Sequence, residues 1–151
     1  MSQNIHIQVE DFDVSEEIEA LTRERPAATG AVATFTGYVR SDDGLSALTL
    51  EHYPGMTERE IARIASEAAK RWPLSGVTII HRVGRLKVGE RIVLVAVASS
   101  HRAAAFAACE FLMDYLKTKA PFWKQEERGG DAQWVEAKSS DDAAAERWRK
   151  S

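Results

Sequence analysis

The sequence contains only one cysteine, Cys109, among its 151 residues. A single cysteine cannot form an internal disulfide, and it excludes the paired CxxC patterns of redox and zinc sites. HxH and HExxH patterns and a glycine-rich phosphate loop are also missing, so we expect no metal site. No apolar run is long enough to span a membrane, and the N-terminus lacks the apolar core of a signal peptide. A cytoplasmic location is therefore the default expectation.

The chain has fewer basic than acidic residues: 20 lysines and arginines and 23 acidic residues give a net charge of −3. This balance gives the chain no global affinity for nucleic acid, so any basic functional site must be local. The length, and a hydrophobic share of 44%, predict one globular domain over residues 1–151. Whether the tail after about residue 139 is ordered stays open.

Six stretches have the apolar alternation or the β-branched content that is typical of strands. The run IVLVAVA is apolar at every position, which predicts a strand covered on both faces. The stretches Gly30–Arg40 and Ala47–Tyr53 are separated by a short polar turn, so we expect them to pair as a hairpin. The expected strands are 4–12, 30–40, 47–53, 76–84, 90–99 and 133–138.

Capping residues and apolar spacing predict helices between these strands. Thr57 and Glu60 form a T-x-x-E capping box at the start of an amphipathic helix over Thr57–Trp72. Ser15 is expected to cap an earlier, short helix. The last stretch, 141–150, is either a short helix or a frayed tail. Helices mixed with hairpins predict an α+β fold rather than a doubly wound parallel sheet.

A second long helix is expected from His101 to about Thr118, with Ser99 and Ser100 as N-cap candidates. The expected buried stripe of this helix is Phe106, Cys109, Met113 and Leu116. On that stripe the thiol is interpreted as part of the core rather than as a nucleophile. His81, which follows the apolar run VTII, is interpreted as structural.

The most basic stretch is YLKTKAPFWK, which places Lys117, Lys119 and Lys124 beside two aromatic residues. A lysine that is partly desolvated or close to other cations has a lowered pKa and can act as a base or stabilise charge. The alternative is that these lysines complement the negative end of the helix dipole. That alternative explains Lys124 less well, because this residue is expected beyond Pro121 in a rigid turn.

The start of the same helix offers a second basic site. His101 and Arg102 follow two serines at a helix N-terminus, where backbone N–H groups favour an anion such as a phosphate. An ordinary cap with two solvated side chains is the alternative. Arg40, at a strand end, is either a further anion contact or a solvated charge.

Distance separates these two basic sites. His101 and Lys117 are sixteen positions apart, which in a straight helix is a rise of roughly 24 Å. One small substrate cannot contact both on the same chain. We therefore expect a shared site to be assembled from two chains related by a two-fold axis.

At these residues the sequence closely resembles the family of molybdopterin synthase catalytic (large) subunits. The matching stretches run in order over nearly the whole chain: GAVATFTGYVR, LTLEHYPGMTE, RWPLSGVTIIHRVG, SSHRAAAF, MDYLKTKAPFWK and WVEA. The resemblance implies an α/β-hammerhead fold with additional antiparallel strands. It implies no bound cofactor.

The resemblance also implies an activity and partners. The family converts cyclic pyranopterin monophosphate into molybdopterin, with sulfur from a small ubiquitin-like subunit whose C-terminal Gly-Gly is a thiocarboxylate. The implied assembly is a heterotetramer built on a central homodimer of the large subunit. The implied catalytic residues are Lys117 and Lys124. Substrate-binding roles are implied for both lysines and for Tyr38, Val39, Arg40, His101, Arg102, Gln125, Glu126 and Lys138.

Two other functions remain open at this stage. A non-catalytic scaffold of the same fold would bind the pterin or the small subunit without turnover. A phosphate-ester hydrolase would use the His101–Arg102 site, although the sequence offers it neither metal ligands nor a nucleophile.

Overall fold

The structure is a computed structural model that describes residues 1–135 and 139–149, with 139–142 described by their backbone alone. A first sheet has the strand order β1-β4-β6-β2, in which only the β1–β4 pair is parallel. A second, antiparallel sheet has the order β5-β3-β7-β8. The strands are β1 (Ser2–Gln8), β2 (Ala31–Tyr38), β3 (Leu45–His52), β4 (Leu74–Arg82), β5 (Gly84–Lys87), β6 (Arg91–Ser99), β7 (Phe122–Arg128) and β8 (Asp131–Val135).

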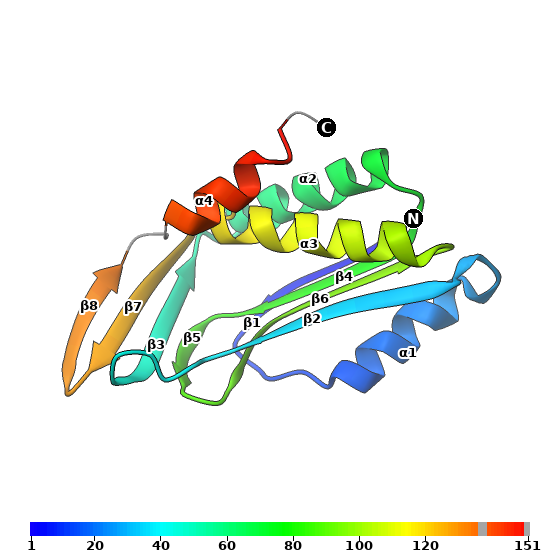
Figure 1. Ribbon diagram of the computed structural model, residues 1–151. Coiled ribbons are helices and arrows are strands. Elements are labelled where there is room, and N and C mark those ends of the chain that lie inside the picture. The colour runs from blue at the N-terminus through cyan, green and yellow to red at the C-terminus, as the bar shows by residue number, and fades with distance from the viewer. Residues whose placement is uncertain (136–138, 150–151) are drawn as a thin grey trace.

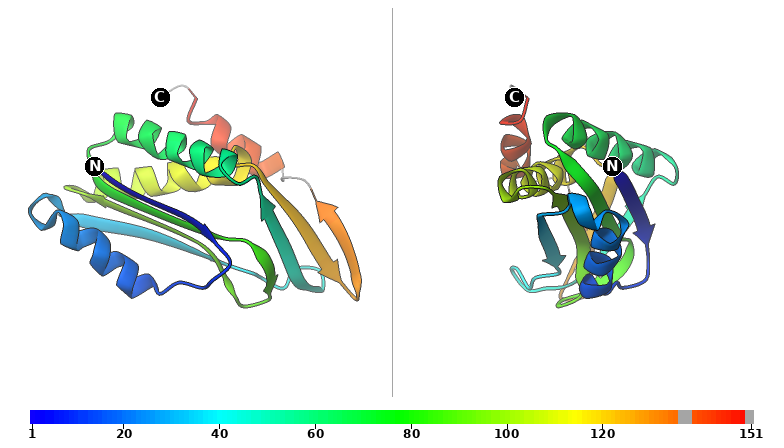
Figure 2. Two further views of the ribbon diagram at one scale, coloured as in Figure 1. Left: turned by 180° about the vertical axis from the view of Figure 1, so that it is seen from behind. Right: turned by 90° about the vertical axis from the view of Figure 1, so that its right-hand side faces the viewer.

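The helices cover the first sheet from both sides, whereas the second sheet extends from one end of the molecule (Figure 1). The helices are α1 (Val14–Glu24), the short 3₁₀ turn η1 (Pro26–Ala28), α2 (Met56–Arg71), α3 (Arg102–Thr118) and α4 (Ser139–Glu146). Seen from behind and from the side, α2 and α3 lie on one face and α1 on the other (Figure 2). The expected α+β class is confirmed, and β6 is buried along Val93–Ser99 as expected of a strand covered on both faces.

The expected hairpin was wrong, because β2 and β3 belong to different sheets. The chain leaves β2 at Val39, whose N–H donates to Glu90 O at 2.8 Å and whose carbonyl accepts from Gly89 N at 2.7 Å. These bonds direct the following turn toward the second sheet, where β3 pairs with β5 and β7. Strand patterns in the sequence identify strands but carry no record of their partners.

The segment after Pro121 was also misread, since it forms the strand β7 rather than a rigid turn. Its partner β3 supplies the pairing that makes it a strand, with Leu50 opposite Lys124 and His52 opposite Phe122. The connection expected between 84 and 90 likewise contains β5, at the edge of the second sheet. Long-range pairing decided both elements.

The three expected helix caps were all wrong, and α3 has His101 rather than Ser99 or Ser100 as its N-cap residue. The α1 helix is capped by Asp13, whose carboxylate accepts from Glu16 N at 3.1 Å, rather than by Ser15. The α2 helix begins at Met56, after Gly55 with φ 85°, and the carboxylate of Glu58 accepts from Gly55 N at 2.8 Å. A positive φ favours glycine, so the turn before the helix forms at Gly55. The helix therefore starts one residue before the expected capping box.

Thr57 is free for another role and is completely buried. Its hydroxyl accepts from Tyr53 N and donates to the carbonyl of Pro121, both at 3.0 Å. This one side chain thus joins the start of α2 to the start of β7. We expect Thr57→Val, which keeps the shape but leaves both backbone groups unpaired, to lower the free energy of unfolding by about 1–3 kcal/mol. Urea unfolding would measure the loss, and an unchanged midpoint would contradict it.

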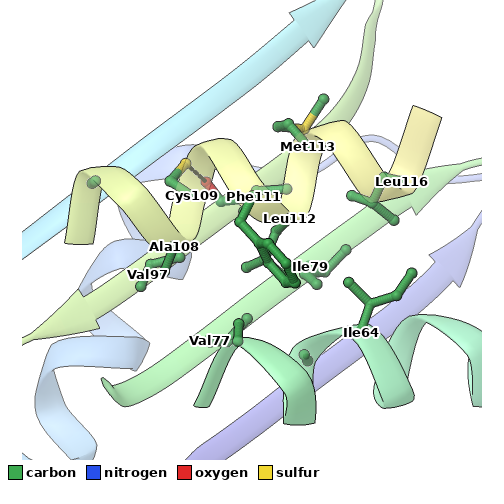
Figure 3. Close-up of a cluster of buried hydrophobic side chains, with 14 of the residues drawn as sticks. Ile64, Val77, Ile79, Val97, Ala108, Cys109, Phe111, Leu112, Met113 and Leu116 are labelled. Carbon is green, nitrogen blue, oxygen red and sulfur yellow. Dashed lines mark hydrogen bonds between the residues drawn. The ribbon is translucent and has the colours of Figure 1, made fainter. Parts of the chain in front are cut away.

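The main core lies between the first sheet and helices α2 and α3 (Figure 3). Cys109 belongs to it, as expected: its thiol lies 3.9 Å from the carbonyl of Val95, and burial raises its pKa to about 11. Phe106 does not belong to the core and is 67% exposed, so that part of the expected stripe was wrong. The alanines beside it allow α3 to approach the sheet closely, and the buried positions of α3 are Ala104, Ala105, Ala108, Cys109, Phe111, Leu112, Met113 and Leu116.

Candidate functional site

A cavity of about 360 Å³ opens where the end of β2, the end of β4 and the last turn of α3 meet. Its wall is polar and apolar in similar measure, and several polar side chains converge on it between apolar ones, as is usual where a ligand must be oriented. The lining residues are Phe35, Thr36, Gly37, Tyr38, Arg40, His81, Ile92, Val93, Met113, Leu116 and Lys117.

A β-bulge shapes the β2 side of this cavity. Gly37 pairs with Val93 but Tyr38 pairs with Arg91, so the register skips one residue of β6. Bulges of this kind bend a strand and re-aim the side chains around it. A Cβ on Gly37 would lie 2.8 Å from Cγ1 of Val93, so this close approach requires glycine.

The segment after the bulge presents two of the expected site residues and buries the third. Tyr38 is exposed at the cavity, and Arg40 lines it while its guanidinium pairs with Asp42 at 3.2 Å. Val39 is buried in a separate cluster under the second sheet. Its contribution is therefore positional, because its backbone bonds hold the two flanking side chains at the cavity.

The three lysines of the basic stretch lie in three different environments. Lys117 is in the last turn of α3 and lines the cavity. Lys119 is the C-cap residue of the same helix, is exposed, and is not part of the lining. Lys124 is half-buried on β7, with Nζ 3.9 Å from the Glu126 carboxylate. The catalytic roles expected for Lys117 and Lys124, and not for Lys119, stay predictions.

Strand alternation divides the residues of β7 between two faces. Phe122, Lys124 and Glu126 share one face, and the Phe122 ring stacks on His81 in the cavity wall. Lys124 therefore lies roughly 7 Å along the strand from that stacked ring, on the same side. Gln125 lies on the opposite face, which also carries Trp123 in contact with the ring of Tyr53.

His81 is a cavity residue that the sequence interpretation did not assign to the site. Its ring is stacked on Phe122 with centroids 4.0 Å apart, and Nδ1 lies 2.9 Å from the carbonyl of Arg82. Burial, with smaller effects of the nearby Lys117 and His52, lowers the pKa of His81 to about 4. A sequence signal was available, because a histidine near the end of a buried strand is well placed to line a site.

The expected anion-binding pair lies at the far end of α3. His101 is the N-cap residue and Arg102 the first helical residue, and both are exposed. The helix between Arg102 and Lys117 rises by roughly 22 Å, so one chain does not bring the two basic sites together. Lys138, the remaining expected contact, falls outside the described residues.

An apolar hollow lies between these two ends, where β2 forms the open edge of the first sheet. Phe106 is 67% exposed and Phe35 is 41% exposed, and both line this hollow. Large apolar side chains gathered at a surface typically mark an interaction site. The hollow shares Phe35 and Met113 with the cavity, so a protein bound here would adjoin the site.

Within residues 1–135 and 139–149, no group of three histidine, cysteine or acidic side chains is placed to hold a metal ion. The helices of that same part are all too short or too polar to cross a lipid bilayer.

Comparisons with known proteins agree on one family. A model of the family described as "MoaE protein" matches residues 7–119. The molybdopterin synthase catalytic subunit of Mesorhizobium japonicum is 58% identical over 154 residues, which cover 100% of this chain and 96% of that protein. The molybdopterin biosynthesis MoaE protein of Burkholderia ambifaria has a TM-score of 0.85 at 53% identity, over 98% of both chains.

A more distant structure matches the fold alone. It is described as a protein–protein complex of subunits 1 and 2 of molybdopterin-converting factor from Helicobacter pylori, with a TM-score of 0.72 at 21% identity over 89% of this chain and 90% of that chain. The solved structures confirm the α/β-hammerhead fold with added antiparallel strands. On this evidence the chain belongs to the MoaE family, the family of molybdopterin synthase catalytic subunits.

Proposed function

We propose that this chain transfers sulfur from the thiocarboxylated C-terminus of a small ubiquitin-like subunit to cyclic pyranopterin monophosphate, which forms the dithiolene of molybdopterin. The observation that carries the proposal is the cavity itself, which brings Lys117 and Arg40 together beside apolar side chains such as Phe35, Met113 and Leu116. Both reactants are anions, and cations in a low-dielectric pocket are what brings anions together.

The sulfur must arrive from outside this chain. The thiol of Cys109 is buried and its pKa is raised to about 11, so almost none of it is thiolate at neutral pH. A persulfide relay on this residue would need both exposure and a lowered pKa. The Helicobacter pylori complex of two subunits supports a separate protein as the partner.

The proposed chemistry assigns roles to the cations around the cavity. The thiocarboxylate sulfur attacks a pterin carbon that carries one ester oxygen of the cyclic phosphate. A carbon–sulfur bond forms as that carbon–oxygen bond breaks, the phosphate stays attached to the pterin at its other end, and the tail carbonyl stays attached to sulfur. Water then cleaves the carbonyl–sulfur bond, which leaves sulfur on the pterin and a carboxylate on the tail. Lys117 assists proton transfer and stabilises the negative charge that develops in both steps.

Lys124 supports the same oxyanion or orients the tail from the β7 side. The Glu126 carboxylate, which Arg128 also contacts at 2.8 Å, lies 3.9 Å from its ammonium group. This pairing limits the positions that the lysine side chain occupies, so Glu126 acts by positioning. We place Tyr38 at the entrance of the site, and the substrate-binding roles proposed for Gln125 and Lys138 rest on the family resemblance.

The phosphate end of the substrate is assigned to a second copy of the chain. The apolar hollow lined by Phe35 and Phe106 is the surface on which that copy would pack. A two-fold axis there would bring the His101–Arg102 pair of one chain toward Lys117 of the other. The proposed assembly is this homodimer with one small subunit on each chain, a heterotetramer.

Reconstitution tests the proposed function. The purified chain, the thiocarboxylated small subunit and cyclic pyranopterin monophosphate are mixed, and molybdopterin is measured. The control is the same small subunit with an ordinary carboxylate, which should give no product. Absence of product with every component intact would defeat the proposal, and tight binding without turnover would indicate the scaffold function instead.

A further inference from the structure

The polar lining of the cavity is unbalanced toward hydrogen-bond donors. The charged forms of Arg40 and Lys117 donate hydrogen bonds and cannot accept them. The hydroxyls of Thr36 and Tyr38 rotate and can serve in either role. His81 is therefore the lining side chain that offers a basic nitrogen lone pair held in a defined direction.

Two contacts define that direction. A carbonyl oxygen only accepts, so the 2.9 Å contact with the carbonyl of Arg82 places the proton of the neutral ring on Nδ1. The lone pair then belongs to Nε2, on the ring edge turned away from that carbonyl. The stack on Phe122, at 4.0 Å and an interplanar angle of 21°, fixes the plane in which Nε2 points.

Burial is the main reason that the ring stays neutral. Lys117 from α3 and, to a smaller extent, His52 from β3 also oppose its protonation. Arg40 lines the same cavity from the segment after β2, so a protonated ring would meet a further cation there. The lone pair is thus available throughout the neutral pH range.

A peptide tail that enters such a cavity needs hydrogen-bond acceptors for its backbone N–H groups. Each residue of an extended tail carries a backbone N–H that loses its water on entry and needs an acceptor. The anionic end of the tail is matched by Lys117 and Arg40, but cations cannot satisfy its N–H groups. We propose that Nε2 of His81 accepts a hydrogen bond from a backbone N–H near the C-terminus of the small subunit. This inference rests on the proposed function, and it makes His81 a tail-binding residue.

Two substitutions distinguish the role of Nδ1 from that of Nε2. In His81→Asn the amide nitrogen takes the place of Nδ1 and keeps the bond to Arg82, but nothing replaces Nε2. In His81→Gln the longer side chain places its amide oxygen near the position of Nε2, so an acceptor remains. We expect His81→Asn to weaken binding of the small subunit about tenfold, and His81→Gln to restore most of the affinity. Titration calorimetry with the ordinary carboxylate form of the small subunit measures both.

The outcomes are distinguishable from failure of the proposed function. If the wild-type chain does not bind the small subunit, the proposed function fails before His81 is examined. If the wild type binds and a folded His81→Asn variant binds equally well, or if the two variants lose the same affinity, the role of His81 is overturned.

A measurement on the wild-type chain needs no substitution. In the ¹⁵N NMR spectrum of the histidine side chains, the Nε2 resonance of His81 should move upfield when the small subunit is added, because its lone pair accepts a hydrogen bond. An Nε2 resonance that stays in place at saturation would equally overturn the inference.

Discussion

Replacement of Lys117 by alanine is expected to lower the rate of molybdopterin formation by about 100-fold or more, which is the usual cost of removing one group that stabilises transition-state charge. The lysine lines the cavity and is otherwise exposed at the end of α3, so its removal leaves the core intact. Single-turnover kinetics with a saturating thiocarboxylated small subunit would measure the chemical step apart from binding.

The chain offers a matched control two residues away. Lys119 is exposed at the same helix end and is absent from the cavity lining, so Lys119→Ala removes a similar charge from the same helix dipole. We expect its rate to stay within about twofold of wild type, since an exposed charge far from the reacting atoms contributes little. Equal losses in the two variants would show that the stretch acts only through its net charge.

Mixing two inactive variants is expected to restore activity if each site is built from two chains. In a mixed dimer of Lys117→Ala and Arg102→Ala chains, one site carries both substitutions and the other carries neither. Each mixed dimer should therefore have about half the activity of a wild-type dimer. The rise from near zero would be measured after the chains are exchanged by partial unfolding and refolding.

A doubly substituted chain gives the complementary control. When a chain with both Lys117→Ala and Arg102→Ala pairs with a wild-type chain, each site of the dimer lacks one of the two groups. Neither site is then active, although one chain is wild type. A site contained within one chain predicts the opposite in both experiments: no recovery in the first mixture and full activity of the wild-type chain in the second. Native mass spectrometry would confirm that mixed dimers had formed.

Local sequence patterns predicted many of the helices, strands and buried residues of this protein. The apolar run of β6, the spacing of α2 and α3 and the burial of Cys109 were predicted because burial imposes periodicity on the sequence itself. The basic stretch was also identified from the sequence, because three lysines beside aromatic residues can be recognised without knowledge of the fold. The separation of Lys117 from Arg102 also followed from the rise of a helix alone.

The errors about strands share one cause, which is that pairing between distant segments leaves no local trace. The sequence predicted β2 and β3 as a hairpin, but the backbone bonds of Val39 to Gly89 and Glu90 direct β3 into the second sheet. The stretch after Pro121 looked like a turn until β3 paired with it. The capping box expected at Thr57 failed for a local reason instead, because Gly55 with φ 85° precedes the helix and Glu58 accepts from its N–H.

What the sequence by itself determined is the set of chemical groups: a basic stretch at one end of α3, the His101–Arg102 pair at the other end, and a single cysteine on a buried stripe. What only the tertiary structure decided is which of these groups share a cavity. The end of β4 meets the end of α3 through the first sheet, and this brings His81 to Lys117 and Arg40 and stacks it on Phe122 from the second sheet. A residue acquires such a role from neighbours that the chain delivers from distant positions, and only the packing of the two sheets sets those neighbours.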